Sequence, residues 1–287
     1  MLSPKQEGVA FAHMAALLFG GTALYAKLIS LSSEVITFWR TVVAILVLVL
    51  ICKLRGRSFS LGGWRPVLIQ IGLGLILGIH WASYYEAIQL STVAIGVTAL
   101  FTAPMLSVLI ESVLNRKKPD AVDLLLCGVV LIGVLCLTFD SNWSRDYMIG
   151  VIFGVISAMF LALRQSLHRR AKVNNPSGMV LLTYQCIGIL ILFTFSGVTA
   201  DLRAVRLNWF DLLILGSFFT AIPHFCNVNA LRTLEAKSVL IITSLMVPYG
   251  MILSAMFLGE VPSVMTLIGS ALVLSAATIE NLRIGRS

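Results

Sequence analysis

Residues 34–53 read EVITFWRTVVAILVLVLICK, and between Arg40 and Lys53 every residue except Thr41 is apolar. A helix that crosses a bilayer needs about 20 mostly apolar residues, because each residue adds about 1.5 Å to the helix and the hydrocarbon core is about 30 Å thick. This stretch therefore predicts a transmembrane helix.

The same pattern recurs along the whole chain, and the gaps between the apolar stretches are too short to hold a soluble domain. The sequence predicts an all-α membrane protein with ten transmembrane helices. The expected spans are residues 8–28, 34–53, 65–88, 92–114, 120–139, 147–168, 178–199, 208–230, 238–258 and 262–282.

The composition argues against a soluble protein. Of the residues, 58% are hydrophobic and 12% are charged, whereas soluble domains carry roughly 25% charged residues. The net charge of +8 does not indicate nucleic-acid binding, because the lysines and arginines are scattered through short gaps and do not form one basic patch. The five cysteines lie in or beside apolar segments without metal-ligand spacing, so we expect no disulfide framework, metal or cofactor.

The distribution of positive charge predicts the orientation, because cytoplasmic loops retain lysine and arginine during insertion. With ten spans and a cytoplasmic N-terminus, 16 of the 21 positive residues fall on the cytoplasmic side and 4 on the outer side. Arg40 lies within the second span. We therefore expect both termini in the cytoplasm and a multi-pass location in the plasma membrane, the inner membrane of a bacterium.

The two halves of the chain have prolines and charged residues at the same spacing. Pro104 precedes Arg116 by 12 residues, and Pro248 precedes Glu260 by 12 residues. We expect a first five-helix repeat over residues 1–143 and a second over residues 144–287. Since five is an odd number of crossings, the second copy enters the membrane upside down, which is an arrangement that transporters use.

Several motifs match one known family across nearly the whole chain. They are Leu18-Phe19-Gly20-Gly21-Thr22 running to Lys27, Phe38-Trp39-Arg40, Ala87 to Pro104, Ala230 to Pro248, Phe257-Leu258-Gly259-Glu260 and Leu267 to Leu272. With these motifs the chain resembles the drug/metabolite transporter superfamily, specifically its EamA-type ten-helix branch. It departs from that pattern at Asn115-Arg116, where many relatives carry Gly-Glu.

The resemblance implies a secondary transporter, more specifically an exporter of a small metabolite such as an amino acid. The expected mechanism is alternating access, in which the two halves rock about a central cavity. The expected partners are a small-molecule substrate and the lipid bilayer, without nucleic acid, and the protein is expected to be a monomer or a homodimer.

Polar residues inside the spans are the candidates for the substrate site, because a charged side chain there costs about 2.5–3.5 kcal/mol on insertion scales and usually faces a wet interior. Three aromatic residues share one face of the third span, and matching polar residues occur in the second, seventh and eighth spans. The predicted substrate-binding residues are Arg40, Trp39, His80, Trp81, Tyr84, Tyr85, Tyr184, Gln185, His224 and Asn227.

Architectural alternatives remain open for several of these positions. Arg40 could form a salt bridge to Glu34 or Glu86, and the aromatic face of the third span could belong to an interfacial belt. Lys27 lies at the outer end of its helix, and we prefer the interpretation that it extends to the lipid headgroups. For Arg164 and Gln165 we likewise prefer an ordinary positive flank over a place at the mouth of the cavity.

Other residues suggest movement, coupling and close packing. Pro104 and Pro248 interrupt equivalent helices and are either gate hinges or fixed bends. Glu86 is a hypothetical site of proton coupling. Small residues such as Gly133 and Gly269 predict close packing of the fifth and tenth spans, with each other or across a dimer.

An intramembrane enzyme is the main alternative class, with a channel as another. The sequence lacks a helical His-Glu-x-x-His motif, a Gly-x-Ser-x-Gly elbow and a phosphate-binding loop, so no catalytic function is expected. It also lacks a segment like a selectivity filter.

Overall fold

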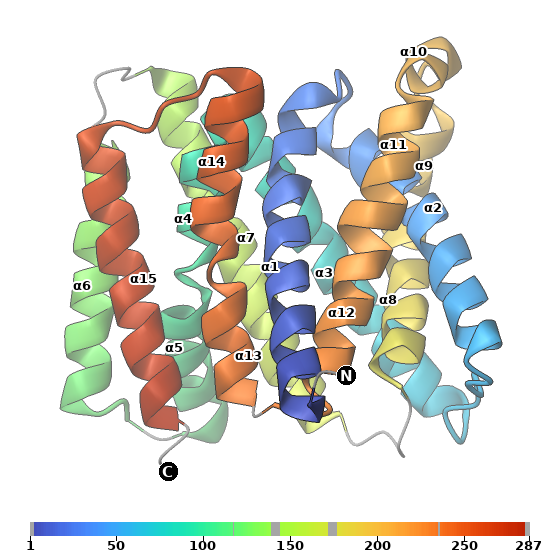
Figure 1. Cartoon of the computed structure of the whole chain (residues 1–287), viewed down its shortest axis with the longest axis horizontal. Helices are drawn as coiled ribbons and strands as arrows, with labels where there is room; N and C mark the ends of the chain where they lie inside the picture. Colours follow the sequence, from blue (N-terminus) through green and yellow to red (C-terminus); the bar gives the residue numbers. More distant parts are fainter. Residues whose placement is uncertain (1–2, 117, 139–143, 172–176, 235, 285–287) are drawn as a thin grey trace.

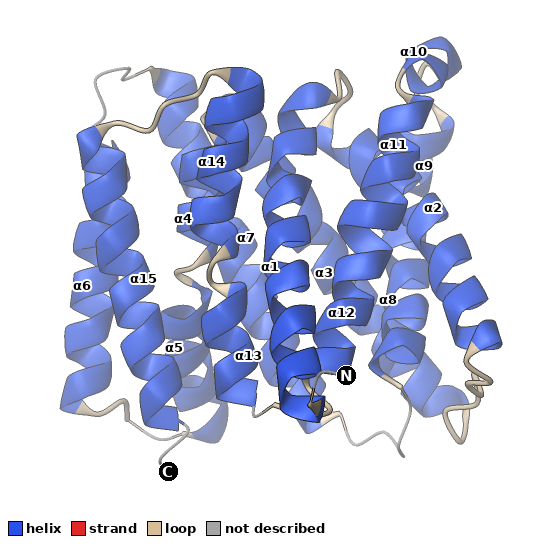
Figure 2. Cartoon of the chain, in the orientation of Figure 1, coloured by secondary structure: helices blue, strands red, loops and turns tan. Residues whose placement is uncertain are grey.

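The fold is described here from a computed structural model, in residues 3–116, 118–138, 144–171, 177–234 and 236–284. These residues form helices and connecting loops, without a strand among them (Figure 2). The helices are α1 Pro4–Leu28, α2 Ser33–Leu54, α3 Trp64–Leu90, α4 Val93–Leu100, α5 Ala103–Asn115, α6 Ala121–Thr138, α7 Arg145–Arg170, α8 Gly178–Leu192, α9 Thr194–Val198, α10 Leu202–Leu207, α11 Trp209–Gly216, η1 Ser217–Ala221, α12 Ile222–Ala230, α13 Ala236–Thr243, α14 Met246–Leu258 and α15 Val264–Ile284.

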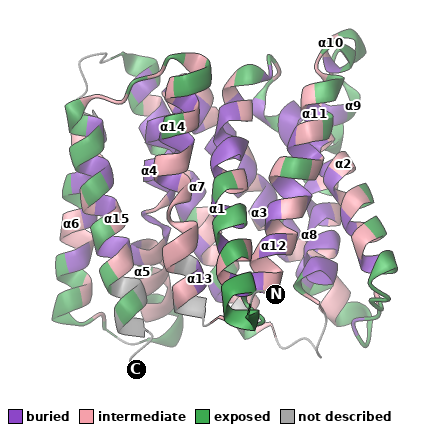
Figure 3. Ribbon diagram, viewed as in Figure 1, coloured by how far each residue is buried: buried purple, intermediate pink, exposed green. Residues whose placement is uncertain are grey.

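Seven of the helical segments in the described residues are long and apolar enough to cross a bilayer. Three shorter apolar segments, Ala121–Leu137, Gly178–Leu192 and Val264–Ile279, coincide with the other expected spans. The chain is therefore a multi-pass membrane protein, while the crossing of the bilayer by all ten segments stays a prediction. Exposed residues cover the outward faces of the helices and buried residues gather in the middle of the bundle (Figure 3).

Prolines lie beside three interruptions of the helices. The expected fourth span is divided into α4 and α5 just before Pro104, and the expected ninth is divided into α13 and α14 just before Pro248. In the eighth span, the wide turn η1 lies between α11 and α12, next to Pro223. The predicted interruptions at Pro104 and Pro248 are thus present, and a hinge motion at these places stays a prediction.

The helix contacts follow a pattern that repeats between the two halves of the chain. Helix α1 packs on α12 and α14, and α7 packs correspondingly on α3, α4 and α5. Helix α2 packs on α8, and α6 packs on α15. If α7 to α15 repeat α1 to α6, then α7 corresponds to α1, α8 to α2 and α15 to α6. The contacts of α1 with the second half then correspond to those of α7 with the first half, and α2–α8 and α6–α15 are contacts between corresponding helices.

Glycines permit the closest helix crossings. A Cβ atom at Gly269 of α15 would lie 2.6 Å from the carbonyl oxygen of Gly133 in α6, and a Cβ atom at Gly74 of α3 would lie 2.1 Å from that of Gln185 in α8. The first crossing confirms the predicted close packing of the fifth and tenth spans within one chain.

The beginning of α1 and the end of α15 lie at the same end of the bundle (Figure 1). We call this the terminal end and the other the distal end. A common end is what an even number of crossings requires. The expected assignment of the terminal end to the cytoplasm stays a prediction, and of the charges on which it rests, Lys117, Lys172 and Arg286 lie outside the described residues.

Candidate functional site

A cavity of about 400 Å³ lies between α1, α2, α3, α7, α8 and the eighth-span helices. Leu100 at the end of α4 and Met246 at the start of α14 also line it, so both interrupted spans reach its wall. Of the predicted substrate-binding residues, six contribute to the wall: Arg40, His80, Trp81, Tyr84, His224 and Asn227. They come from α2, α3 and α12, whereas neither of the two residues predicted in the seventh span, Tyr184 and Gln185, is among the lining residues.

Arg40 is the most deeply buried charged residue of this wall, with 3% of its surface exposed. Its guanidinium carbon lies 3.9 Å from the ring centre of Trp81 and 4.9 Å from that of Tyr85. Within the described part of the chain it forms no hydrogen bond or ion pair, and its buried Nε has no acceptor. The alternative of a salt bridge to Glu34 or Glu86 is therefore not realised in this structure.

Two histidines from different halves of the chain complete the centre of the wall. The His224 ring lies edge-on to Phe19, with 5.1 Å between ring centres, and 6.4 Å from Trp81. The His80 ring stacks on Tyr84 at 6.3 Å. These contacts place the aromatic face of α3 inside the bundle, since Trp81 and Tyr84 are both buried.

Ser157 of α7 holds His80 in place. The Nδ1 atom of His80 lies 2.8 Å from the Ser157 hydroxyl oxygen, and the same hydroxyl donates to the His80 carbonyl at 3.0 Å. Because a hydroxyl can both donate and accept, it satisfies two groups of α3 at once. The imidazole is thereby fixed between α3 and α7.

Arg164 of α7 provides a second positive charge on the wall. Its Nε and Nη2 atoms donate to Oε1 of Gln185, at 3.1 Å and 2.5 Å. The amide nitrogen of Gln185 in turn donates to Gln70 at 2.7 Å. Gln185 is thus placed behind the wall, where it positions Arg164, and the interpretation of Arg164 as a simple positive flank does not describe its surroundings.

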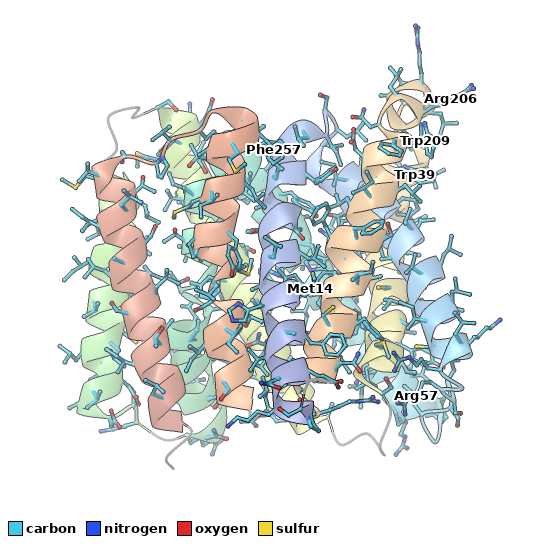
Figure 4. The ribbon with its side chains drawn as sticks, viewed as in Figure 1. Met14, Trp39, Arg57, Arg206, Trp209 and Phe257 are labelled. Atoms are coloured by element: carbon cyan, nitrogen blue, oxygen red, sulfur yellow. The ribbon has the colours of Figure 1, made fainter. Side chains whose placement is uncertain are left out.

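The remaining predicted binding residues lie outside the described wall of the cavity. Tyr85 is fully buried in the apolar core beneath Arg40. Tyr184 donates its hydroxyl to the Phe59 carbonyl at 2.7 Å. Trp39 packs edge-on against its neighbour Phe38 and is found on the α2–α11 side of the bundle (Figure 4). Gln185, as described above, lies behind the wall, where its amide contacts the wall residues Arg164 and His168.

Some wall residues were not singled out from the sequence. Phe19, Phe219 and His168 line the cavity together with Arg164 and Gln165. The spacing of positions 164, 165 and 168 on one helical face was a usable signal, since residues three and four apart are neighbours on a helix. The two phenylalanines gave no signal, because apolar residues occur on every side of a membrane helix.

A polar network joins the two halves at the distal end. Lys27 Nζ lies 3.6 Å from Glu260 and donates to the Ser91 carbonyl at 2.6 Å. Glu260 accepts from the backbone N–H of Val93 at 3.0 Å and from the Ser254 hydroxyl at 2.7 Å. Lys27 thus binds within the protein, which replaces the preferred interpretation that it extends to the headgroups.

The two ends of the bundle differ in how they close around the cavity. Ile29, Ile36, Ile88 and Leu212, all near the distal ends of their helices, belong to one buried apolar cluster. Towards the terminal end the wall includes Gln165 and Leu231, which are exposed. The cavity is therefore covered at the distal end and reaches exposed residues at the terminal end.

Glu86 lies outside the described cavity wall and is half-buried in α3. Its suggested part in coupling stays a prediction. No group of three or more histidine, cysteine, aspartate or glutamate side chains in the described residues is arranged to hold a metal ion.

Comparison with known proteins agrees with this architecture. The model of the EamA-like transporter family matches residues 6–139 and again residues 148–281. The chain is 24% identical to "Uncharacterized transporter YxxF" of Bacillus subtilis, over 98% of this chain and 92% of that protein. It is 23% identical to an "Uncharacterized transporter" of Archaeoglobus fulgidus, over 95% of both chains. A solved structure with 19% identity superposes with a TM-score of 0.64 over 98% of both chains, which supports the fold alone. The chain thus belongs to the EamA-like transporter family.

Proposed function

We propose that this transporter carries a small metabolite across the bacterial inner membrane by alternating access around the central cavity. The observation that carries the proposal is the cavity itself, which is buried, bears Arg40 without a protein acceptor, and is covered at one end only. A carrier needs a substrate site that is closed to one side of the membrane at a time.

The proposed moving parts are two inverted five-helix repeats, residues 1–143 and 144–287. Support comes from the two matches to the family model and from the helix contacts, because the first helix of each half packs against helices of the other half. With both termini in the cytoplasm, the cavity of this structure faces inward. The interruptions beside Pro104 and Pro248 reach the cavity wall, and we assign them the bending that opens and closes it.

An inward-facing cavity would load from the cytoplasm, which fits export. An amino acid is the cargo that the family resemblance suggests, and the charge of the wall refines this below. Coupling to protons through Glu86 completes the proposed mechanism. Substrate flux that does not change when the pH gradient is collapsed would exclude that coupling.

Cysteine labelling from each side of the membrane tests the proposal. Val228 lines the cavity, so Val228→Cys is introduced into a chain whose five native cysteines are replaced by alanine. A membrane-impermeant maleimide should label inside-out vesicles at least about tenfold faster than right-side-out vesicles, because only the terminal end is accessible. Arg57→Cys, at an exposed position outside the cavity wall in the loop between α2 and α3, is the control for orientation. Equal labelling of Val228→Cys from both sides would indicate a channel and contradict alternating access.

A further inference from the structure

The charge of the cavity wall is one-sided. Among the described residues that line it, two are arginines and three are histidines, and none is an aspartate or a glutamate. A charge buried in the membrane is costly unless it is paired, so such a wall favours an occupant of opposite charge. The excess of basic side chains in the wall therefore indicates a substrate with negative charge.

Arg40 retains most of its hydrogen-bonding capacity. A guanidinium carries five N–H donors, and the central carbon of this one lies over the Trp81 ring, 3.9 Å from its centre. Within the described chain none of these donors has an acceptor, although the residue is almost fully buried. The contact with Trp81 holds the group while its N–H donors lack acceptors in the described chain, and a guanidinium with free donors can bind a planar carboxylate through two parallel hydrogen bonds.

Arg164 is held by hydrogen bonds and not by an aromatic ring, but it also supports a negatively charged substrate. Gln185 accepts from its Nε and Nη2 atoms and is itself held by Gln70. The neutral amide fixes the guanidinium without cancelling its charge. Arg40 and Arg164 line the same cavity, so the fields of the two positive charges add within it.

Apart from these charged and titratable groups and the uncharged polar side chains of Thr22, Tyr84, Gln165 and Asn227, the wall is apolar. Phe19, Leu77, Leu161, Phe219 and Met246 provide side chains that can pack against a hydrocarbon or an aromatic ring. At about 400 Å³ the cavity has the size of sites for small organic molecules. An inorganic anion would leave this apolar surface without a partner.

We infer that the substrate is a small organic acid whose carboxylate, or a similar oxyanion, binds Arg40, with Arg164 available to a second acidic group. The inference rests on the proposed carrier function and narrows its substrate class. A zwitterionic amino acid is a poorer fit, because the described wall offers no carboxylate to its ammonium group. The face of Trp81, which could attract an ammonium, is already covered by Arg40.

Binding to the purified full-length protein is measured with a series of molecules that share one phenyl ring. Phenethylamine is positively charged, L-phenylalanine is zwitterionic, 3-phenylpropanoate carries one negative charge, and phenylsuccinate carries two. The second series, hexylamine, L-norleucine and hexanoate, repeats the comparison on a linear chain. Ligand binding is read from the rise in melting temperature and by titration calorimetry.

The carboxylates should bind at least about tenfold more tightly than the matching amino acids, which corresponds to about 1.4 kcal/mol. Arg40→Gln should remove this preference, and Arg40→Lys should retain part of it. Arg164→Gln should weaken phenylsuccinate more than 3-phenylpropanoate. The matched control is Arg206→Gln, which removes an exposed charge at α10, away from the cavity, and should change nothing (Figure 4).

The inference is overturned if neither carboxylate series binds more tightly than its amino acids, or if Arg40→Gln leaves the preference intact. The melting temperature without ligand shows that each variant is folded. Uptake and efflux in proteoliposomes are measured separately. Anions that bind but are not carried would refute the proposed function and leave the binding specificity in place, whereas transport of L-phenylalanine in preference to 3-phenylpropanoate would refute the substrate class alone.

Discussion

Pro223 leaves a backbone carbonyl available for a hydrogen bond from a helix far away in the sequence. Proline has no N–H, so in an α-helix it leaves the carbonyl four positions earlier, here that of Phe219, without its usual donor. The hydroxyl of Thr22 in α1 donates to this carbonyl at 2.6 Å. Because Phe219 lines the cavity, the bond also ties the cavity wall to α1.

Replacing Thr22 by valine should therefore destabilise the protein by about 1 kcal/mol, since it leaves a buried carbonyl without a donor while preserving the shape of the side chain. Thermal unfolding in detergent measures the effect. The matched control is Thr194→Val, because the exposed Thr194 hydroxyl bonds only within its own segment, to Leu190. Equal melting temperatures for the two variants would show that the Thr22 bond contributes nothing.

At the scale of the helices, packing depends on a few glycines. Gly74 and Gly188 lie where α3 crosses α8, and Gln185 follows the same face of α8. A change in this crossing would move Gln185 and with it Arg164. The packing of α3 on α8 thus determines, through Gln185, where the charge of Arg164 lies in the cavity wall.

Two alanine substitutions in α3 separate packing from helix propensity. Gly74→Ala would place a Cβ atom 2.1 Å from the Gln185 carbonyl oxygen, whereas a Cβ atom at Gly72 meets nothing within 4 Å. We expect Gly74→Ala to destabilise the protein by about 1–3 kcal/mol, because the helices must separate. Gly72→Ala should be neutral or stabilising by up to about 1 kcal/mol. Similar melting temperatures for both variants would contradict the close crossing.

At the scale of the whole molecule, different polar contacts join the two halves at the two ends of the bundle. The Lys27–Glu260 pair joins the halves at the distal end. The position that matches Glu260 in the first half is Arg116, and beside it Asn115 accepts a hydrogen bond from Arg170, at 2.6 Å on the exposed surface. We propose that the Lys27–Glu260 pair holds the distal end of the cavity closed in this structure.

Removing the distal ion pair should shift the population towards the opposite state. In the Val228→Cys labelling assay, Glu260→Gln is expected to raise the rate in right-side-out vesicles about fivefold, which corresponds to about 1 kcal/mol. Asp146→Asn, which neutralises an exposed carboxylate, is the control. An unchanged rate for Glu260→Gln would show that the pair does not hold the distal end closed.

The sequence predicted most of what depends on local physics. Long apolar runs specify helices in a bilayer, because every backbone polar group there must be bonded within its own segment. Proline explains the interruptions near Pro104, Pro223 and Pro248, and the cost of an intramembrane charge indicated Arg40 as an interior residue. Each of these effects acts within a few residues of the chain.

The sequence by itself determined the helices, their interruptions and the family. Only the tertiary structure decided that Arg164 faces the cavity, that Gln185 lies behind it, and that Lys27 pairs with Glu260. The physical reason is that lipid and protein interior are both apolar, so the pattern along a membrane helix says little about which side packs against its neighbours. The rotation of each helix about its own axis, which decides the side that faces the cavity, is set by contacts between segments far apart in the chain.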